Sequence, residues 1–342
     1  MIKASIVGVA GYTGGELLRI LLRHPETEVV GVFGEEHVGA RLASLHPQLS
    51  GVVGERRVEK PDYGKIGSES DVVFMATPNG VAMRVVPKIL EGGARVVDLS
   101  ADYRFKDVKV YEKYYTKHES PHVRGVYGLP ELYREEIRKA TLIANPGCYP
   151  TAAILALAPL VKERMVELDR LVVDALSGTS GAGRGLREGL HHPLCGENAS
   201  AYSATTHRHL PEIKQELERL ADGKVGLHFT PHLIPVVRGI LCTAHAFLKE
   251  ERSKEELLNV YRKFYSGEPF VRVVEGLPEL NYVVGSNYCD IGLEVSEDGK
   301  WVVIVSAIDN LLKGGSGQAV QNMNLRFGLK ETMGLEALPM RP

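Results

Sequence analysis

The sequence has few cysteines, no long hydrophobic run and almost no net charge. Four cysteines scattered over 342 residues exclude a disulfide framework and the closely spaced thiols of a structural zinc site. Every apolar run is well short of the ~20 residues that span a bilayer, so no membrane partner is expected. A net charge of −2, without basic or acidic runs, argues against a nucleic-acid partner. The chain enters a strand directly, which leaves no room for a signal peptide and predicts a cytoplasmic location.

The first half of the chain alternates short apolar strands with helical stretches. Expected strands are Lys3–Val9, Val29–Phe33, Asp71–Ala76, Arg95–Leu99 and Thr141–Asn145, with helices over 14–23 and 81–91. Alternation of this kind implies right-handed crossovers and an α/β fold with a doubly wound parallel sheet of the Rossmann type.

The second half has longer, alternating strands. They are expected at Leu171–Leu176, Val225–Phe229, Ile240–Leu248, Tyr288–Val295 and Trp301–Ile308, the last two joined by an Asp298-Gly299 hairpin. This pattern predicts an α+β catalytic domain with a mostly antiparallel sheet. We place the domains at 1–146 and 147–312, followed by a Gly-rich turn at 314–317 and a helix to about Phe327.

Three glycines, Gly8, Gly11 and Gly14, enclose Tyr12 and Thr13 between the first strand and the first helix. This spacing permits a tight turn and a close approach of a pyrophosphate to the helix N-terminus, so it predicts dinucleotide binding. Glu35 stands 21 residues after Gly14, where an acid accepts from a ribose 2′-hydroxyl, which predicts NAD. A solvated loop glutamate explains Glu35 equally well.

Cys148 lies between a buried strand and an Ala/Leu-rich helix expected from about Thr151. A thiolate at a helix N-terminus is stabilised by the helix dipole and is nucleophilic at neutral pH. Cys242 and Cys289 fall inside expected strands and are interpreted as core residues.

A thiolate beside a hydride carrier indicates acyl-level reduction or aldehyde oxidation, which needs a general acid–base. His207 and His209 precede a helix in a polar loop, and His191, His192 and His232 are the alternatives. If the loop is extended, His207 and His209 point in opposite directions. The H-x-H pair lacks a third ligand at a sensible spacing, so no metal is expected, and surface histidines remain the competing interpretation.

A Gly/Ser loop follows the strand that ends near Leu176. Its residues Ser177, Gly181, Ala182 and Gly183 are candidates for wrapping a ribose or phosphate, or for a flexible connector. Candidate anion anchors are Arg104, Arg184, Arg208 and Arg238, which the sequence does not rank.

The chain resembles the N-acetyl-γ-glutamyl-phosphate reductases. The resemblance rests on GVAGYTG, LSADYRF, YGLPELYR, NPGCYPTA, SGTSGAGR, HRHLPEI, PVVRGI and DNLLKGGSGQAVQNMN, in this order over residues 8–324. It implies that Cys148 carries a thioester, that the HRH segment supplies the acid–base with His207 as first choice, and that SGAGR and Lys313-Gly314 line an NADP site. It also implies that residues 313–342 return to the N-terminal domain and that the chain forms a dimer or tetramer.

The implied reaction is NADPH-dependent reduction of the acyl phosphate to N-acetylglutamate 5-semialdehyde in arginine biosynthesis. A sister enzyme of lysine biosynthesis, acting on a carrier-linked aminoadipyl phosphate, carries Asn-Ala after the cysteine; Tyr149-Pro150 favours the arginine branch, and a bifunctional enzyme stays open. A non-catalytic NAD(P) sensor and an oxidative dehydrogenase of a phosphorylated sugar are further alternatives. This chain departs from the family at Gly34-Glu35, where the family usually carries Ser-Arg or a similar pair suited to NADP.

Overall fold

The computed structural model describes residues 1–340, and the chain divides into two compact units. The first unit comprises Met1–Gly147 and Gly315–Glu336, and the second comprises Cys148–Gly314 together with the segment from Ala337 onward. The expected division differs from this one mainly at the C-terminal segment. All of residues 313–342 are expected with the N-terminal domain, whereas only Gly315–Glu336 belong to the first unit.

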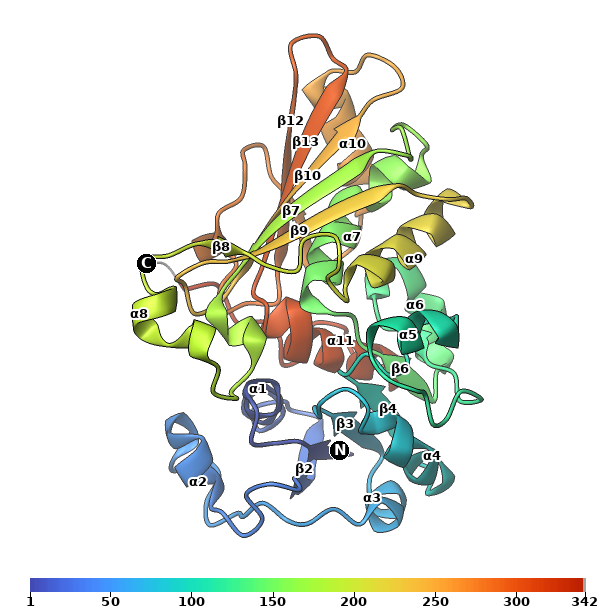
Figure 1. The fold of residues 1–342 in the computed structure, drawn as a ribbon. Helices are drawn as coiled ribbons and strands as arrows, with labels where there is room; N and C mark the ends of the chain where they lie inside the picture. Colours follow the sequence, from blue (N-terminus) through green and yellow to red (C-terminus); the bar gives the residue numbers. More distant parts are fainter. Residues whose placement is uncertain (341–342) are drawn as a thin grey trace. The chain divides into compact units, whose positions relative to one another are not determined.

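The first unit contains a six-stranded sheet in the order β2-β1-β3-β4-β6-β5, with every neighbouring pair parallel. Its strands are β1 (Ile2–Val7), β2 (Thr27–Phe33), β3 (Val72–Met75), β4 (Arg95–Asp98), β5 (Val126–Tyr127) and β6 (Leu142–Ala144). Its helices are α1 (Tyr12–Leu21), α2 (Leu42–Leu45), η1 (Pro47–Leu49), α3 (Tyr63–Glu69), α4 (Ala82–Glu91), α5 (Val108–Tyr114), α6 (Pro130–Lys139) and α11 (Gly317–Arg326). The doubly wound parallel sheet is therefore confirmed (Figure 1).

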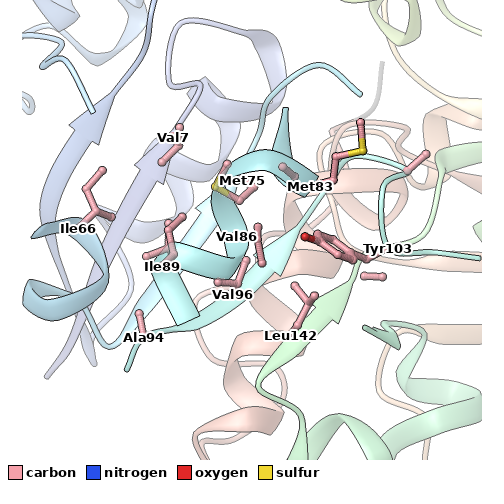
Figure 2. Packing of buried hydrophobic residues seen from close by; sticks show 14 of the residues in the cluster. Val7, Ile66, Met75, Met83, Val86, Ile89, Ala94, Val96, Tyr103 and Leu142 are labelled. Atoms are coloured by element: carbon pink, nitrogen blue, oxygen red, sulfur yellow. The ribbon is translucent and has the colours of Figure 1, made fainter. Parts of the chain in front are cut away.

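The core of the first unit forms where α4 packs on the sheet. Met83, Val86 and Ile89 recur at helical spacing along one face of α4 and meet Met75 and Val96 from the strands (Figure 2). Gly92 and Gly93 end this helix as expected, because Gly93 takes φ +99°.

The second unit contains a seven-stranded sheet in the order β11-β12-β13-β10-β7-β9-β8. Its strands are β7 (Leu171–Ser177), β8 (Ser200–Ala201), β9 (Leu227–Leu233), β10 (Ile240–Phe247), β11 (Val271–Val273), β12 (Cys289–Val295) and β13 (Trp301–Ile308). Only the pairs β11–β12 and β7–β9 are parallel, so the expectation of a mostly antiparallel sheet is confirmed. The β12–β13 hairpin turns at Gly299 with φ +68°.

Helices of the second unit are α7 (Cys148–Lys162), η2 (Thr179–Ala182), η3 (Glu188–Leu190), α8 (His192–Cys195), α9 (Leu210–Ala221), α10 (Lys254–Phe264) and η4 (Leu280–Tyr282). In Figure 1, α7, α9 and α10 lie together on one side of the sheet. Along β10, residues alternate between buried and half-buried, because only one face of the sheet is covered by these helices.

The Gly-rich segment before α11 was expected as a turn, and this expectation is wrong. Leu312–Ser316 forms a π-helical turn, η5, that runs directly into α11. Glycine weakens a helix on its own, but here the backbone is fixed by burial of the whole segment and by the bond from Gly314 N–H to the Asp309 carbonyl, 2.9 Å.

Candidate active site

The glycine turn of the first unit is built by β1, which ends at Val7, and α1, which begins at Tyr12. Gly8 has φ +91°, and a Cβ there would lie 2.3 Å from the Ala76 carbonyl oxygen. A Cβ on Gly14 would lie 2.2 Å from the Gly8 carbonyl oxygen. Both glycines are therefore required by the packing of the chain itself.

Gly11 is different from its two neighbours in the motif. The nearest atom to a Cβ built on Gly11 is the Gly8 carbonyl oxygen at 3.7 Å, so the chain itself has room for a side chain. Gly11 is also the N-cap of α1, with no side-chain cap and no acid in the first turn of the helix. An open approach to uncapped N–H groups at a helix N-terminus fits a dinucleotide pyrophosphate.

Cys148 is the first residue of α7, three residues earlier than the sequence predicted for this helix. Its side chain is half-buried, whereas every residue from Tyr149 to Val161 is buried. A Cβ on Gly314 would lie 2.8 Å from the Cys148 Cβ, so Gly314 packs against Cys148. The absence of a side chain at Gly314 is what leaves room for Cys148.

The other cysteines differ from Cys148 in their surroundings. Cys242 and Cys289 are fully buried in strands, which confirms them as core residues. Burial raises the pKa of Cys242 to about 12, so this thiol stays protonated. Cys195 is half-buried, and its Sγ lies 3.3 Å from the Leu190 carbonyl oxygen.

His207 and His209 lie together, and the expectation that they point in opposite directions is wrong. Their ring centroids are 4.8 Å apart at 71°. The reason is that His209 is the N-cap of α9 in the right-handed helical region, φ −83° and ψ −17°, so the segment is not extended. The Tyr149 ring contacts both, with centroids 5.6 Å from His207 and 5.9 Å from His209.

The His207 ring makes a hydrogen bond to the backbone of His209. Its Nδ1 accepts the backbone N–H of His209 at 3.1 Å, which places the proton of the neutral ring on Nε2. Burial, with a smaller contribution from the charge of Arg208, lowers the pKa of His207 to about 4. His207 is therefore neutral at physiological pH.

A relay of two tyrosine hydroxyls adjoins these rings, and sequence reasoning missed one of them, Tyr202. The Tyr149 hydroxyl donates to the His232 carbonyl at 3.2 Å, so it accepts from the Tyr202 hydroxyl at 3.0 Å. A charge on Cys148 contributes to raising the pKa of Tyr202, after burial, which reflects their proximity. Nothing in the sequence marks Tyr202 except its place in the loop before His207.

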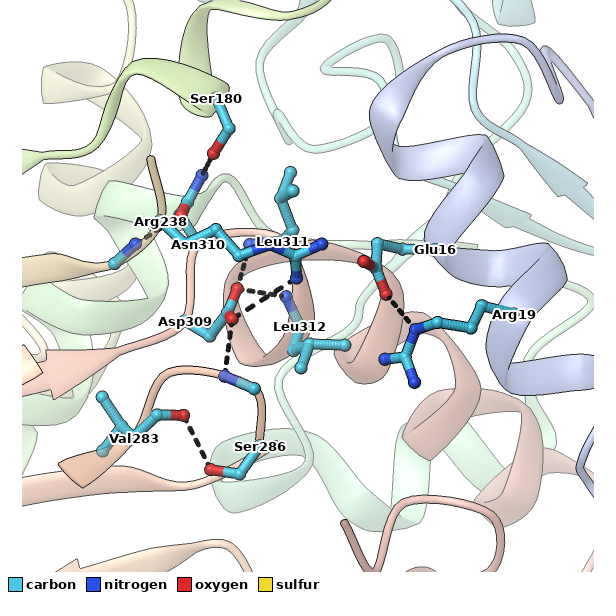
Figure 3. Close-up of polar contacts among 12 residues, drawn as sticks. Glu16, Arg19, Ser180, Arg238, Val283, Ser286, Asp309, Asn310, Leu311 and Leu312 are labelled. Carbon is cyan, nitrogen blue, oxygen red and sulfur yellow. Dashed lines mark hydrogen bonds and ion pairs between the residues drawn. The ribbon is translucent and has the colours of Figure 1, made fainter. Parts of the chain in front are cut away.

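Two loops of the second unit are joined through Asp309 and Asn310 (Figure 3). The Asn310 amide donates to Ser180 Oγ at 2.9 Å, and its carbonyl accepts the Gly239 N–H at 2.7 Å. The fully buried Asp309 carboxylate accepts N–H groups from three residues, Gly285, Leu311 and Leu312. These bonds fix the segment that leads to Gly314 and Cys148.

The remaining predicted cofactor contacts of the Gly/Ser loop lie in the second unit. Ser177 ends β7 and is buried, while Gly183 has φ +84°. A Cβ on Gly183 would meet nothing within 4 Å, and a Cβ on Gly181 would lie 3.0 Å from Ser177 Oγ. Ala182 is half-buried at the end of η2. These residues stay predicted contacts.

The predicted anion anchors have different surroundings. Arg104, in the first unit, is buried and donates to the carbonyls of Asn145 at 2.8 Å and Leu99 at 2.7 Å. Arg184 and Arg208, in the second unit, are exposed. Arg238 pairs with Asp309 at 3.5 Å. His191 and His192 are also exposed, whereas the Nδ1 of His232 is buried without a hydrogen-bond partner among residues 1–340.

Asp98 is a buried carboxyl that the sequence did not single out. It ends β4 and accepts the N–H and the hydroxyl of Ser100 at 3.0 and 2.8 Å. Burial and the nearby charge of Asp102 raise the pKa of Asp98 to about 7. Within residues 1–340, no group of His, Cys, Asp and Glu side chains is suited to hold a metal ion, and no helix is long and apolar enough to cross a membrane.

Both units match domains of one protein family. Residues 3–140 match the NAD binding domain of semialdehyde dehydrogenase, and residues 148–310 match its dimerisation domain. The chain is 53% identical to the N-acetyl-gamma-glutamyl-phosphate reductase of Methanopyrus kandleri, over 98% of each chain. It is 50% identical to the enzyme of that name from Symbiobacterium thermophilum, over 100% of this chain and 99% of the relative.

Solved structures show the fold alone. Aspartate semialdehyde dehydrogenase II of Vibrio cholerae superposes with a TM-score of 0.72 at 16% identity, over 96% of this chain and 98% of that chain. The full-length relatives extend the assignment beyond the fold. The chain belongs to the N-acetyl-γ-glutamyl-phosphate reductase family of semialdehyde dehydrogenases.

Proposed function

We propose that this chain reduces N-acetyl-γ-glutamyl phosphate to N-acetylglutamate 5-semialdehyde, with release of phosphate, in arginine biosynthesis. The reductant is NADPH. The observation that carries the proposal is the position of Cys148, half-buried at the first residue of α7 and adjacent to the Tyr149 ring that contacts both histidines. The names of the full-length relatives favour this reaction over the lysine-branch enzyme and over a non-catalytic sensor.

In the proposed reaction the Cys148 thiolate attacks the acyl carbon. The bond between that carbon and the phosphate oxygen breaks, inorganic phosphate leaves, and a thioester to Sγ remains. A reduced nicotinamide dinucleotide, when bound, supplies the hydride that reduces the acyl group. The carbon–sulfur bond then breaks, which releases the aldehyde and regenerates the thiolate. The N–H groups at the start of α7 would stabilise the oxyanion formed at each attack.

We propose that the HRH segment provides the acid–base, with a revised order of candidates. His207 was the first choice, but its Nδ1 already accepts a backbone N–H and its pKa is lowered to about 4. A group protonated only near pH 4 is a weak base at neutral pH. His209 is therefore the better candidate, and His207 orients it. His209→Asn should then lower kcat strongly, whereas His207→Asn should act less and through the position of His209.

We also propose that the chain forms a homo-oligomer through the half-exposed face of the seven-stranded sheet, in the cytoplasm. The support is the match to a dimerisation domain and the apolar side chains on that face. Leu241 pairs with Leu176 across β10 and β7, and Phe247 contacts Trp301, which is 49% exposed. Leu241→Arg should shift the oligomer toward a smaller species in sedimentation velocity.

The proposed cytoplasmic location is supported by the four free cysteines, which suit a reducing compartment.

The test uses the reverse reaction, phosphate-dependent reduction of NADP⁺ with N-acetylglutamate semialdehyde. The analogues without the acetyl group and with six carbons are assayed beside it. Turnover that requires phosphate and the acetylated five-carbon aldehyde is expected. Turnover only with the carrier-linked six-carbon analogue would move the enzyme to lysine synthesis.

Cys148→Ala should abolish turnover while folding and dinucleotide binding remain, and Cys195→Ala serves as the matched control. Substantial activity in the Cys148→Ala protein would refute the thioester mechanism.

A further inference from the structure

A carboxylate and a tyrosine of the first unit are joined at the end of β2. Glu35 follows this strand by two residues, and the Tyr63 hydroxyl donates to its Oε1 at 3.1 Å. Burial, and next the hydrogen bond to Glu35, raises the pKa of Tyr63 to about 12, so the hydroxyl donates throughout the neutral range. Among the described residues, Tyr63 is the only hydrogen-bond partner of the Glu35 side chain, which leaves Oε2 able to accept.

Tyr63 is a fixed donor because its helix is anchored at this end. It is the first residue of α3, and the Asp62 side chain caps that helix by accepting the N–H groups of Gly64 and Lys65 at 3.1 and 3.2 Å. The Tyr63 side chain is partly buried and packs against the hydrophobic core of the first unit. The hydroxyl therefore holds the carboxylate in one place.

Glu35 lies at the same edge of the sheet as the glycine turn. The ends of β1 and β2 are in register, with Val7 opposite Phe33, and the Gly8 N–H donates to the Phe33 carbonyl at 2.8 Å. In dinucleotide-binding sheets the acid at the end of the second strand accepts from the adenine ribose. The held carboxylate thus occupies the position from which a ribose is recognised.

Three arginines that follow Glu35 in the chain are engaged elsewhere. Arg41 pairs with Glu55 at 3.2 Å, and Arg56 and Arg57 each donate to a backbone carbonyl, at 3.0 and 2.7 Å. None of these guanidinium groups contacts Glu35 in the described part of the chain. A ribose 2′-phosphate would therefore meet the negative charge of Glu35 without a contact from these three guanidinium groups.

We infer that Glu35, held by Tyr63, accepts the 2′-hydroxyl of the adenine ribose and thereby admits NADH as a cofactor beside NADPH. The inference rests on the proposed dinucleotide binding at the glycine turn. It concerns only the ribose end of the site, and the chemistry at Cys148 is the same with either reductant.

Isothermal titration calorimetry with NADH and with NADPH, on the full chain and without acyl substrate, tests the inference. NADH is expected to bind no more than about tenfold more weakly than NADPH, because Glu35 accepts from the ribose 2′-hydroxyl and repels a 2′-phosphate. Glu35→Ala should weaken NADH about 10- to 100-fold and leave NADPH binding unchanged or tighter. Tyr63→Phe should give the same change in smaller measure, because it removes only the hydroxyl that holds Glu35.

The matched control is Glu36→Ala, which removes the neighbouring exposed negative charge and should leave the NADH-to-NADPH ratio unchanged. Binding of NADPH alone by the unaltered protein would overturn the inference but not the proposed function. An equal change of the ratio in the Glu35 and Glu36 variants would overturn it as well, since the effect would then be one of net charge. Absence of binding by both dinucleotides would overturn both proposals, whereas NADH binding without acyl-phosphate turnover would overturn only the proposed function.

Discussion

The Asp309 carboxylate allows a quantitative test of how the second unit holds the segment beside the nucleophile. It accepts backbone N–H groups from Gly285, Leu311 and Leu312 and pairs with Arg238 (Figure 3). Asp309→Asn keeps the shape of the side chain but replaces one acceptor oxygen by an NH₂ group. Whichever way the amide is turned, this NH₂ group faces at least one N–H donor in a fully buried place.

The expected cost follows from these contacts. Loss of one hydrogen bond to a charged acceptor costs about 1.5–3 kcal/mol, and the buried donor left without an acceptor costs about 1–3 kcal/mol more. We expect the free energy of unfolding of the second unit to fall by about 3–5 kcal/mol. For a unit of this size the melting temperature should fall by roughly 6–20 °C.

Differential scanning calorimetry is the assay, because two compact units can unfold in separate transitions. Arg238→Met is the control, since it removes only the ion pair of a partly exposed arginine and should cost about 1 kcal/mol or less. If Asp309→Asn cost no more than Arg238→Met, the bonds to the backbone N–H groups would not be what holds this segment.

Three further predictions concern the glycine turn and the two buried titratable groups. Gly11→Ala should weaken dinucleotide binding in calorimetry and leave the melting temperature unchanged. Gly14→Ala should weaken binding and also destabilise the first unit by about 1–3 kcal/mol, because its Cβ would meet the Gly8 carbonyl oxygen. Equal losses of stability in the two variants would contradict this geometry. Because the pKa of His207 is lowered from 6.5 to about 4, the unfolded chain binds a proton that the folded chain does not, and the second unit should lose up to about 3 kcal/mol as pH falls through this window. Melting curves of His207→Gln should lack that loss. Asp98 gives the first unit the opposite pH dependence of stability, because its pKa is raised from 3.8 to about 7. The stability that the protonated carboxyl contributes is fully present below pH 4 and is lost as pH rises to 7. Asp98→Asn should flatten this dependence.

The fold was predictable from the sequence because it depends on periodicity. Alternating strands and helices before residue 146 and the Asp298-Gly299 hairpin each carry a local signal, and the parallel and mostly antiparallel types of the two sheets are as expected. The short strands β5, β8 and β11 were not predicted. The Gly-rich turn before α11 was not predictable as helix. Its local preference is for a turn, and only burial against the rest of the chain overrides that preference.

The candidate site was predictable as a set of motifs but not as an arrangement. Cys148 was placed at a helix N-terminus from its neighbours alone. The contact of Gly314 with Cys148 joins residues far apart in the chain, and no local pattern encodes it. The mutual position of His207 and His209 was predicted wrongly, because the assumption of an extended loop ignored that His209 is the N-cap of α9.

The proposed nucleophile and the proposed acid–base are held in place by different kinds of contact. Cys148 is set by α7, whose next thirteen residues are buried, so the nucleophile is fixed by the core of the second unit. The histidines follow an exposed segment in which Ser203 and Thr205 take φ +45° and +65°, a conformation that costs a β-branched residue free energy. Strain of this kind persists only where neighbouring contacts enforce it, and here the Tyr202–Tyr149 bond and the packing of Tyr202 on His207 are those contacts. The proposed nucleophile is therefore preorganised by helix packing, whereas the proposed acid–base is held by a short set of side-chain contacts. Substitutions in the tyrosine relay should consequently disturb proton transfer before they disturb the reactivity of the thiol.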